Sequence, residues 1–359
     1  MIDAPLRVLH APSLVGGNPG ALARAEREIG LASWCVSTDP NVFGYAVDEQ
    51  GRTVREGRVA YELQRWRLLR RALRDYDVVH FNFGRTLFPN LLQLDLPMLR
   101  RAGKGIFMTY QGDDARQGDY CRRHFEITFA TRVPDGYYSA RSDAEKRRRI
   151  ARVARYADGI FALNPDLLHV LPPKAQFVPY AHVDPRDWRP TTPSGNLVPV
   201  IVHSPTHRAV KGTDLVLAAV ERLKSEGERF EFVLIENMSH ADARRNYERA
   251  DLAVDQLFGG WYGGFAVEMM ALGKPVLCYM READLKFLPD RMARELPIIR
   301  TTPQSIYETL KEWVRAPRER VFAAGERSRA YVEAWHDPVR IARRLKEAYE
   351  AAVDRRRGA

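Results

Sequence analysis

The sequence contains few cysteines and no long apolar run. Its three cysteines, Cys35, Cys121 and Cys278, lie far apart and have no ligand-like spacing to the nine histidines. Neither a disulfide framework nor a structural metal site is therefore expected. No stretch approaches the roughly 18 consecutive apolar residues of a membrane span, and the first residues lack the basic and apolar regions of a secretory signal. We therefore expect a cytoplasmic protein.

Acidic residues are outnumbered by basic ones, 46 to 56, which gives a formal net charge of +10. Residues 1–180 hold 27 Lys and Arg against 20 Asp and Glu, and the remainder holds 29 against 26. The excess lies mainly in the first half, but it is diffuse. No basic stretch is interleaved with stacking aromatic residues as in the known nucleic-acid-binding modules, so we expect no nucleic-acid partner.

Short apolar runs alternate with helical patterns along the 359 residues, which is typical of βαβ units and parallel sheets. A chain of this length suits two domains of about 150 to 200 residues. We predict an α/β protein in which each half forms its own doubly wound, Rossmann-like sheet. The predicted strands are 6–10, 32–36, 77–81, 105–110, 159–163 and 176–178 in the first half, and 199–203, 230–235, 252–254, 275–279 and 297–299 in the second.

A proline-rich stretch separates the two halves. Residues 184–196 hold three prolines and a glycine without apolar periodicity, which predicts a linker. We place an N-terminal domain over 1–183 and a C-terminal domain over 197–334. The last segment, 335–359, contains an amphipathic helix that we expect to pack along one domain, bridge both, or return to the N-terminal domain. Its apolar stripe consists of Ile341, Leu345, Tyr349 and Val353.

Two glycines follow the first predicted strand. Gly16 and Gly17 lie between that strand and a helical pattern, where bare backbone lets amide groups approach an anion closely. The spacing matches neither G-x-G-x-x-G nor a P-loop, which argues against a dinucleotide site. A tight turn without a ligand is the alternative.

Three cationic or ionisable side chains follow the predicted strand 199–203. His207, Arg208 and Lys211 lie in the loop after it, and open α/β sheets bind ligands beyond the carboxyl ends of their strands. Such a cluster suits a diphosphate. Solvated surface charges are the alternative.

A single carboxylate lies on an otherwise apolar helical pattern. Gly263, Gly264 and Phe265 begin this helix, and Glu268 falls at the border of its buried stripe. A carboxylate in that place needs hydrogen-bond donors. Ribose hydroxyls would supply them, and an internal Arg or Lys partner is the alternative.

Two further stretches could carry chemistry. Asp113, Asp114 and Asp119 follow a predicted strand and could bind a divalent metal or act as acid or base, although acidic turn residues without a ligand are the alternative. The segment 62–74 is a basic amphipathic helix that could make weak contact with anionic lipid headgroups. A helix packed on its own sheet with a solvated basic face is the alternative.

Taken together, the Gly16-Gly17 loop, Lys211-Gly212 and the run Glu268-Met-Met-Ala-Leu-Gly-Lys-Pro-Val276 resemble the family 4 glycosyltransferases, also called group 1 glycosyl transferases. The resemblance implies the GT-B architecture, in which two Rossmann-like domains face each other across a cleft. It also implies retaining transfer of a hexosyl group from a nucleotide sugar, a UDP-sugar or GDP-mannose, to a hydroxyl of a glycan or lipid-linked acceptor. Such transfer serves polysaccharide or glycolipid synthesis, at the inner membrane face where the acceptor is a lipid, and requires no metal or other cofactor.

The same resemblance implies residue roles. Lys211 would hold the donor diphosphate, with Arg208 sharing the role, and Glu268 would bind the ribose; these three form the expected catalytic set. The acceptor would lie on the N-terminal side, near Gln111, Asp113 and Asp114. The remaining residues expected to bind the donor are Gly16, Gly17, His207, Asn237, Gly263, Gly264 and Phe265.

Three positions depart from the family pattern. Thr206 stands where relatives have the phosphate-binding arginine, so Arg208 is assigned in its place. Gly260 stands where relatives have the first glutamate of a pair, and Gln111 stands where many have a histidine.

The missing glutamate keeps two other functions open. One is a non-catalytic partner or nucleotide-sugar binding subunit with the same fold. The other is a nucleotide-sugar epimerase, for which Asp113, Asp114 and His203 are the candidate acids and bases.

Overall fold

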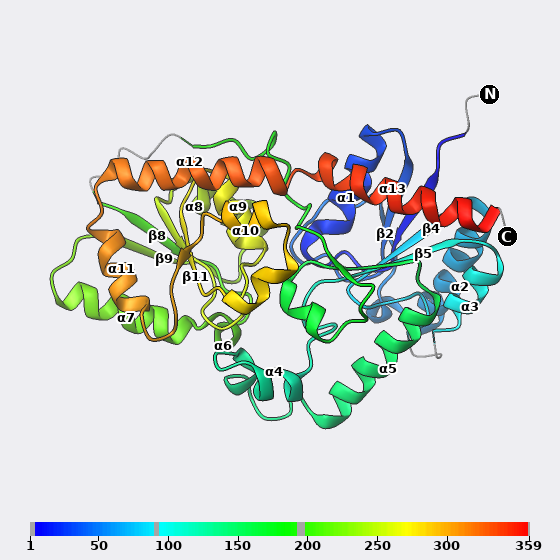
Figure 1. Cartoon of the computed structure of the whole chain (residues 1–359), viewed down its shortest axis with the longest axis horizontal. Coiled ribbons are helices and arrows are strands. Elements are labelled where there is room, and N and C mark those ends of the chain that lie inside the picture. The colour runs from blue at the N-terminus through cyan, green and yellow to red at the C-terminus, as the bar shows by residue number, and fades with distance from the viewer. Residues whose placement is uncertain (1–3, 90–92, 192–197, 358–359) are drawn as a thin grey trace. The chain divides into compact units, whose positions relative to one another are not determined.

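The computed structural model describes residues 4–89, 93–191 and 198–357, which form two compact units (Figure 1). Unit 1 comprises Met1–Gln117, Ala140–His182 and Pro338–Ala359, and unit 2 comprises Gly118–Ser139 and Val183–Asp337. The chain therefore passes between the units four times.

Unit 1 contains a seven-stranded parallel sheet in the order β3-β2-β1-β4-β5-β6-β7. The strand order reverses between β1 and β4, as in a doubly wound sheet. The strands are β1 Arg7–Ala11, β2 Ala32–Ser37, β3 Glu49–Gln50, β4 Val78–Asn82, β5 Gly105–Tyr110, β6 Gly159–Ala162 and β7 Gln176–Phe177. The main helices are α1 Asn18–Glu28, α2 Arg58–Asp75, α3 Asp95–Arg101, α5 Ala140–Tyr156 and α13 Pro338–Arg357.

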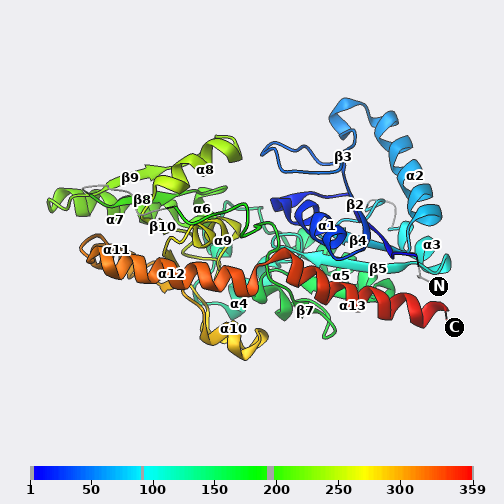
Figure 2. The same cartoon turned by 90° about the horizontal axis from the view of Figure 1, so that it is seen from above.

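Successive side chains along these strands point to opposite faces of the sheet, so each face is covered by its own apolar layer. In β5, Ile106 and Met108 belong to the core under α2, α3 and α5, whereas Phe107 belongs to the core that holds α1 and α13. Helix α13 lies beside α1 in both views (Figures 1 and 2). Its predicted apolar stripe is buried in that second core.

A buried polar network also anchors α13. The Tyr349 hydroxyl is 2.6 Å from His80 Nδ1 and donates to Glu26 Oε1 over 3.0 Å. Glu26 also accepts from Ser33 and lies 2.9 Å from His10 Nε2. These five side chains are buried, so their hydrogen bonds replace the water that they lose on folding.

Unit 2 contains a five-stranded parallel sheet in the order β12-β11-β10-β8-β9, which reverses between β8 and β10. The strands are β8 Val200–His203, β9 Glu231–Leu234, β10 Leu252–Val254, β11 Val276–Cys278 and β12 Ile299–Arg300. The helices are α4 Gly118–His124, α6 Arg208–Lys211, α7 Thr213–Ser225, α8 His240–Arg249, α9 Gly264–Ala271, α10 Asp290–Arg294, α11 Ile306–Val314 and α12 Arg318–Trp335. The predicted pair of doubly wound sheets is confirmed.

The two units do not coincide with the first and second halves of the sequence, because two segments pack in the other unit. Gly118–Ser139 lies in the first half of the sequence but packs in unit 2, because Phe129 and Tyr138 join the core formed by α7 and α11. Pro338–Ala359 returns to unit 1. Part of the predicted linker 184–196 lies outside the described residues; its described part, 184–191, belongs to unit 2.

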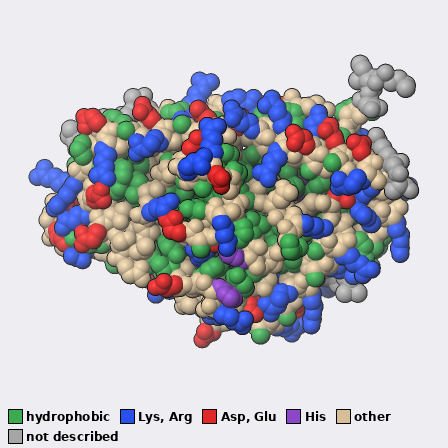
Figure 3. Space-filling view, viewed as in Figure 1, with side chains coloured by type: hydrophobic (Ala, Val, Ile, Leu, Met, Phe, Trp, Pro, Cys, Tyr) green, Lys and Arg blue, Asp and Glu red, His purple; other side chains and the backbone are tan. Residues whose placement is uncertain are grey.

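No helix in the described ranges is long and apolar enough to cross a membrane. On the face shown in Figure 3, Lys and Arg side chains are scattered among Asp and Glu and do not form one continuous stripe.

Candidate functional site

The candidate site lies at the carboxyl ends of β8 and β10, where the strand order of unit 2 reverses. This reversal is the place where open α/β sheets bind ligands. The loop after β8 leads into α6, and the loop after β10 leads through the glycine run into α9. Both predicted motifs of the second half therefore meet at one edge of one sheet.

Lys211 is held against the glycine run by a carboxylate that the sequence analysis missed. Its Nζ donates to Asp255 Oδ1 over 2.7 Å, and Asp255 Oδ2 accepts from the Gly263 amide over 2.6 Å. Asp255 is fully buried and the Lys211 side chain is 11% exposed. A Cβ on Gly263 would lie 3.0 Å from Lys211 Nζ, so the lysine approaches closely because this residue is glycine.

His203 connects the two strands of the switch point. Its Nδ1 lies 2.8 Å from the Val254 carbonyl and its Nε2 lies 2.9 Å from the Thr213 hydroxyl. Burial lowers the pKa of His203 to about 4, so the ring is neutral at neutral pH. The neutral tautomer with a proton on Nδ1 donates to Val254 and accepts from Thr213. Both ring nitrogens thus have protein partners, which argues against an acid or base role.

Arg208 lies at the exposed rim of the site. Its Nε and Nη2 donate to the two carboxylate oxygens of Glu236 over 2.8 and 2.5 Å, and its side chain is 60% exposed. This hydrogen bonding lowers the pKa of Glu236. The preceding His207 caps α6, because its Nδ1 accepts from the Val210 amide. Asn237 follows Glu236 and has a positive φ of 54°.

Glu268 has a protein partner on another helix. His240 Nε2 lies 2.7 Å from Glu268 Oε1, and this hydrogen bond raises the pKa of His240. Glu268 is buried on α9, and His240 is the first residue of α8. Glu268 therefore has a partner within the protein, as the alternative to ribose binding predicted, but this partner is a histidine and not the expected Arg or Lys.

The Arg281 guanidinium occupies the space where a side chain at position 260 would begin. Gly260 has a φ of 76°, and a Cβ there would lie 2.5 Å from Arg281 Nη1. The Arg281 guanidinium stacks 3.6 Å from the centre of the Phe125 ring and donates to Asp284 Oδ2 over 2.8 Å. The glycine thus allows both the left-handed backbone and the close approach of Arg281.

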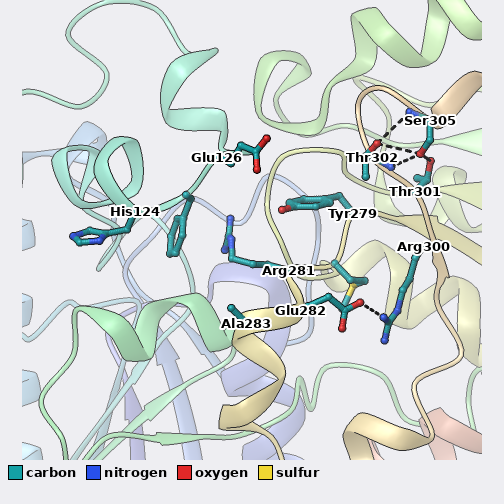
Figure 4. A pocket seen from close by; sticks show the side chains of 12 residues that line it. His124, Glu126, Tyr279, Arg281, Glu282, Ala283, Arg300, Thr301, Thr302 and Ser305 are labelled. Atoms are coloured by element: carbon teal, nitrogen blue, oxygen red, sulfur yellow. Dashed lines mark hydrogen bonds and ion pairs between the residues drawn. The ribbon is translucent and has the colours of Figure 1, made fainter.

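Arg281 also forms one wall of a cavity of about 540 Å³ at the carboxyl ends of β11 and β12 (Figure 4). Glu126 and Tyr279 also line this cavity. Arg300 and Glu282 form an ion pair at another side. This cavity could not be predicted from the sequence, because Glu126 belongs to the segment that joins unit 2 from the first half of the chain.

The predicted residues of the first half, except Asp119, lie in unit 1. Gly16 and Gly17 are both left-handed, and a Cβ on Gly16 would lie 3.7 Å from Gln111 Oε1. Asp114 accepts from the amides of Gln111 and Gly112 over 3.1 and 2.6 Å. Burial raises the pKa of Asp114 to about 6. Asp114 therefore caps the turn after β5 and lies in the same loop as Gln111.

The remaining acidic residues do not gather into a metal site. Asp113 lies 3.7 Å from Arg116 Nη1 in unit 1, whereas Asp119 accepts from the Tyr120 amide in unit 2. Throughout the part of the chain that the structure describes, no group of three His, Cys, Asp or Glu residues could hold a metal ion.

Comparison with known proteins identifies the class of fold. No family model matches the sequence, and no curated protein matches it. The structure resembles sucrose-phosphate synthase from Thermosynechococcus elongatus, with 14% identity, a TM-score of 0.64 and coverage of 97% of this chain and 98% of that one. It also resembles the catalytic domain of starch synthase IV from Arabidopsis thaliana bound to ADP and acarbose, with 10% identity, a TM-score of 0.63 and coverage of 98% and 99%.

A third similar structure is a mutant of TarM from S. aureus in complex with fondaparinux, alpha-GlcNAc-glycerol and UDP. The identity is 10% and the TM-score 0.52, over 81% of this chain and 58% of that one. At these identities the likeness establishes the fold, which is the GT-B type of these glycosyltransferases.

Proposed function

We propose that the protein is a glycosyltransferase that transfers a hexosyl group from a nucleotide sugar to an acceptor hydroxyl with retention of configuration. The observation that carries the proposal is the Lys211 ammonium, held by Asp255 beside the start of α9 at the switch point of unit 2. A fixed cation next to a helix N-terminus suits a diphosphate. The GT-B fold and the motif run ending at Val276 agree with this interpretation.

In the proposed reaction, the bond between the anomeric carbon and the phosphate oxygen breaks, and the electron pair leaves with the nucleoside diphosphate. The acceptor hydroxyl attacks the same face and forms the new C–O bond, and its proton passes to the leaving phosphate. Lys211 donates a hydrogen bond to the charge that develops on this phosphate. Because the phosphate takes the proton, the reaction needs neither a protein base nor a metal.

The helix start supports the same charge. The Gly263 amide is occupied by Asp255, so the amides of Gly264 and Phe265 are the ones that the first turn of α9 can direct at phosphate oxygens. Arg208 would contribute from the rim of the loop. Glu268 would bind the ribose by its second carboxylate oxygen or by exchanging its hydrogen bond with His240.

For the rest of the reaction we rely on the fold and on the solved neighbours. A UDP-sugar is our preferred donor, with GDP-mannose as the second choice, because TarM is solved with UDP. The acceptor, a glycan or a lipid-linked sugar, would bind near Gln111, Asp113 and Asp114. Polysaccharide or glycolipid synthesis in the cytoplasm, at the inner membrane face where the acceptor is a lipid, would be the setting.

A second candidate is a nucleotide-sugar binding subunit, favoured by Arg281 at the place where a carboxylate would otherwise face the sugar. A thermal-shift panel of UDP, GDP and ADP tests what both candidates share. A nucleotide at 100 times its dissociation constant stabilises a protein by about 2.7 kcal/mol. No response to any of the three contradicts both candidates, and release of nucleoside diphosphate from a donor then separates the transferase from the binding subunit.

A further inference from the structure

Helix α2 exposes three large apolar side chains on one face. Val59, Leu63 and Trp66 are 75%, 52% and 46% exposed, and their spacing of four and three residues places them on the same side of the helix. The opposite face packs into unit 1 through Leu68 and Leu69. Single exposed apolar residues are ordinary, but three adjacent ones form a patch that water solvates poorly.

Arginines continue this face toward the end of the helix. Arg67, Arg70 and Arg74 are exposed and fall with the three apolar residues in a sector of about 100° around the axis. Arg74 pairs with Asp75. Within the described ranges, Arg67 and Arg70 take part in no ion pair.

The acidic residues of α2 lie outside this sector. Glu62 is engaged with the buried Arg65, and Asp75 ends the helix. The exposed face is therefore apolar in its first half and cationic in its second, with no carboxylate on it. Figure 2 shows α2 at the outside of unit 1, where its other face packs on the sheet through Leu68 and Leu69.

We propose that this face of α2 docks on an anionic lipid surface. Val59, Leu63 and Trp66 enter the boundary between headgroups and acyl chains, and Arg67, Arg70 and Arg74 bind lipid phosphates. A helix with an apolar patch and a basic flank lies in the plane of a membrane interface in this way. The Trp66 ring lies 4.5 Å from the buried Phe88 ring. The inner part of the Trp66 ring is therefore held by packing, while its exposed edge can reach the lipid.

The arrangement of charges on this face favours a lipid surface over an acidic protein as its partner. The arginines form a row beside the apolar residues and have no carboxylates among them, which suits a continuous sheet of phosphates. This docking concerns unit 1 and does not depend on the reaction proposed for unit 2.

Cosedimentation of the full chain with vesicles tests the proposal. We expect binding to vesicles that contain phosphatidylglycerol, weak binding to pure phosphatidylcholine, and a loss of binding as salt rises. The double variant Arg67→Gln/Arg70→Gln should bind about 30-fold more weakly, since each basic residue near the surface contributes about fivefold. Arg148→Gln/Arg149→Gln, at exposed arginines of α5, is the matched control and should bind as the unmodified protein does.

The apolar half is tested by Leu63→Ser/Trp66→Ser, with Val42→Ser at another highly exposed site as the control. We expect the double variant to lose binding while its circular dichroism spectrum shows that it stays folded at the assay temperature; its unfolding temperature should fall somewhat, because Trp66 also packs on Phe88. Absence of binding to phosphatidylglycerol vesicles, equal binding to phosphatidylcholine, or unaltered binding of either double variant would overturn the proposal. If the purified chain does not bind vesicles, the alternative is that this face binds an acidic protein.

Discussion

Lys211 donates from its Nζ to the buried Asp255 carboxylate over 2.7 Å, and the other oxygen of that carboxylate holds the Gly263 amide. One side chain thus connects the loop after β8 to the start of α9. It fixes the position of Lys211 and orients the first turn of the helix that carries Glu268. The loop and the helix therefore both depend on one buried carboxylate.

Removing the carboxylate should destabilise unit 2. Asp255→Ala leaves the Lys211 ammonium nearly buried without its partner, which costs about 3 to 5 kcal/mol for such a pair. Urea unfolding measures the loss. Glu236→Ala, which removes the partner of the exposed Arg208, is the control and should change the unfolding free energy by less than about 1 kcal/mol. Equal effects of the two substitutions would contradict the connecting role of Asp255.

Introducing a glutamate at position 260 should destabilise unit 2. Gly260 has a left-handed backbone, and any Cβ there would lie 2.5 Å from Arg281 Nη1. Gly260→Glu should therefore lower the unfolding free energy by at least about 1 to 2 kcal/mol, and Gly260→Ala should do nearly the same. Wild-type stability of Gly260→Glu in the same unfolding assay would show that the backbone and Arg281 adjust freely.

The hydrogen bond between His240 and Glu268 should make stability depend on pH. It raises the pKa of His240 in the folded protein, so its contribution is fully present below the unfolded pKa of about 6.5. It is lost as the pH rises through the raised folded pKa. The difference in unfolding free energy between the unmodified protein and Glu268→Gln should therefore shrink as the pH rises from about 6.5 through the raised pKa of His240 in the folded protein. A difference that is constant or grows would refute the assignment.

The hydroxyl of Tyr349 should contribute to the docking of α13. Tyr349→Phe removes hydrogen bonds to His80 and Glu26 in a region without solvent. Leaving these two buried partners unsatisfied costs about 1 to 3 kcal/mol each, and thermal unfolding should show a loss of about 2 kcal/mol or more. A change below about 0.5 kcal/mol would mean that water replaces the hydroxyl.

Much of the fold could be predicted from the sequence, because buried parallel strands are short apolar runs. Every predicted strand overlaps an observed one. Strand β3 was missed since Glu49–Gln50 is two residues long and polar. The place of Gly118–Ser139 in unit 2 could not be predicted either, because it depends on contacts of Phe129 and Tyr138 with a core formed by residues far away in the sequence.

The candidate site was predicted in part. Lys211 and Gly263 were predicted because they lie in loops that follow strands, and Glu268 was predicted because it is the one carboxylate on an otherwise apolar helical pattern. Asp255 also follows a strand directly, and this signal could have revealed it. His240 and Arg281 could not be found, since their contacts with Glu268 and Gly260 depend on the packing of α8 and of the loop after β11.

The proposed reaction is tested by the turnover of nucleotide sugars by the purified protein and by Lys211→Ala, with Arg208→Ala as the matched cation control. We expect the unmodified protein to release nucleoside diphosphate and transfer the sugar. Lys211→Ala leaves the buried Asp255 without its cation, so urea unfolding first establishes the conditions in which this variant is folded; there it should turn over about 100- to 1,000-fold more slowly, the usual effect of removing one such electrostatic group. Arg208→Ala, at the exposed rim, should lose less than Lys211→Ala. Full turnover by folded Lys211→Ala would contradict the role proposed for this lysine and with it the proposed reaction.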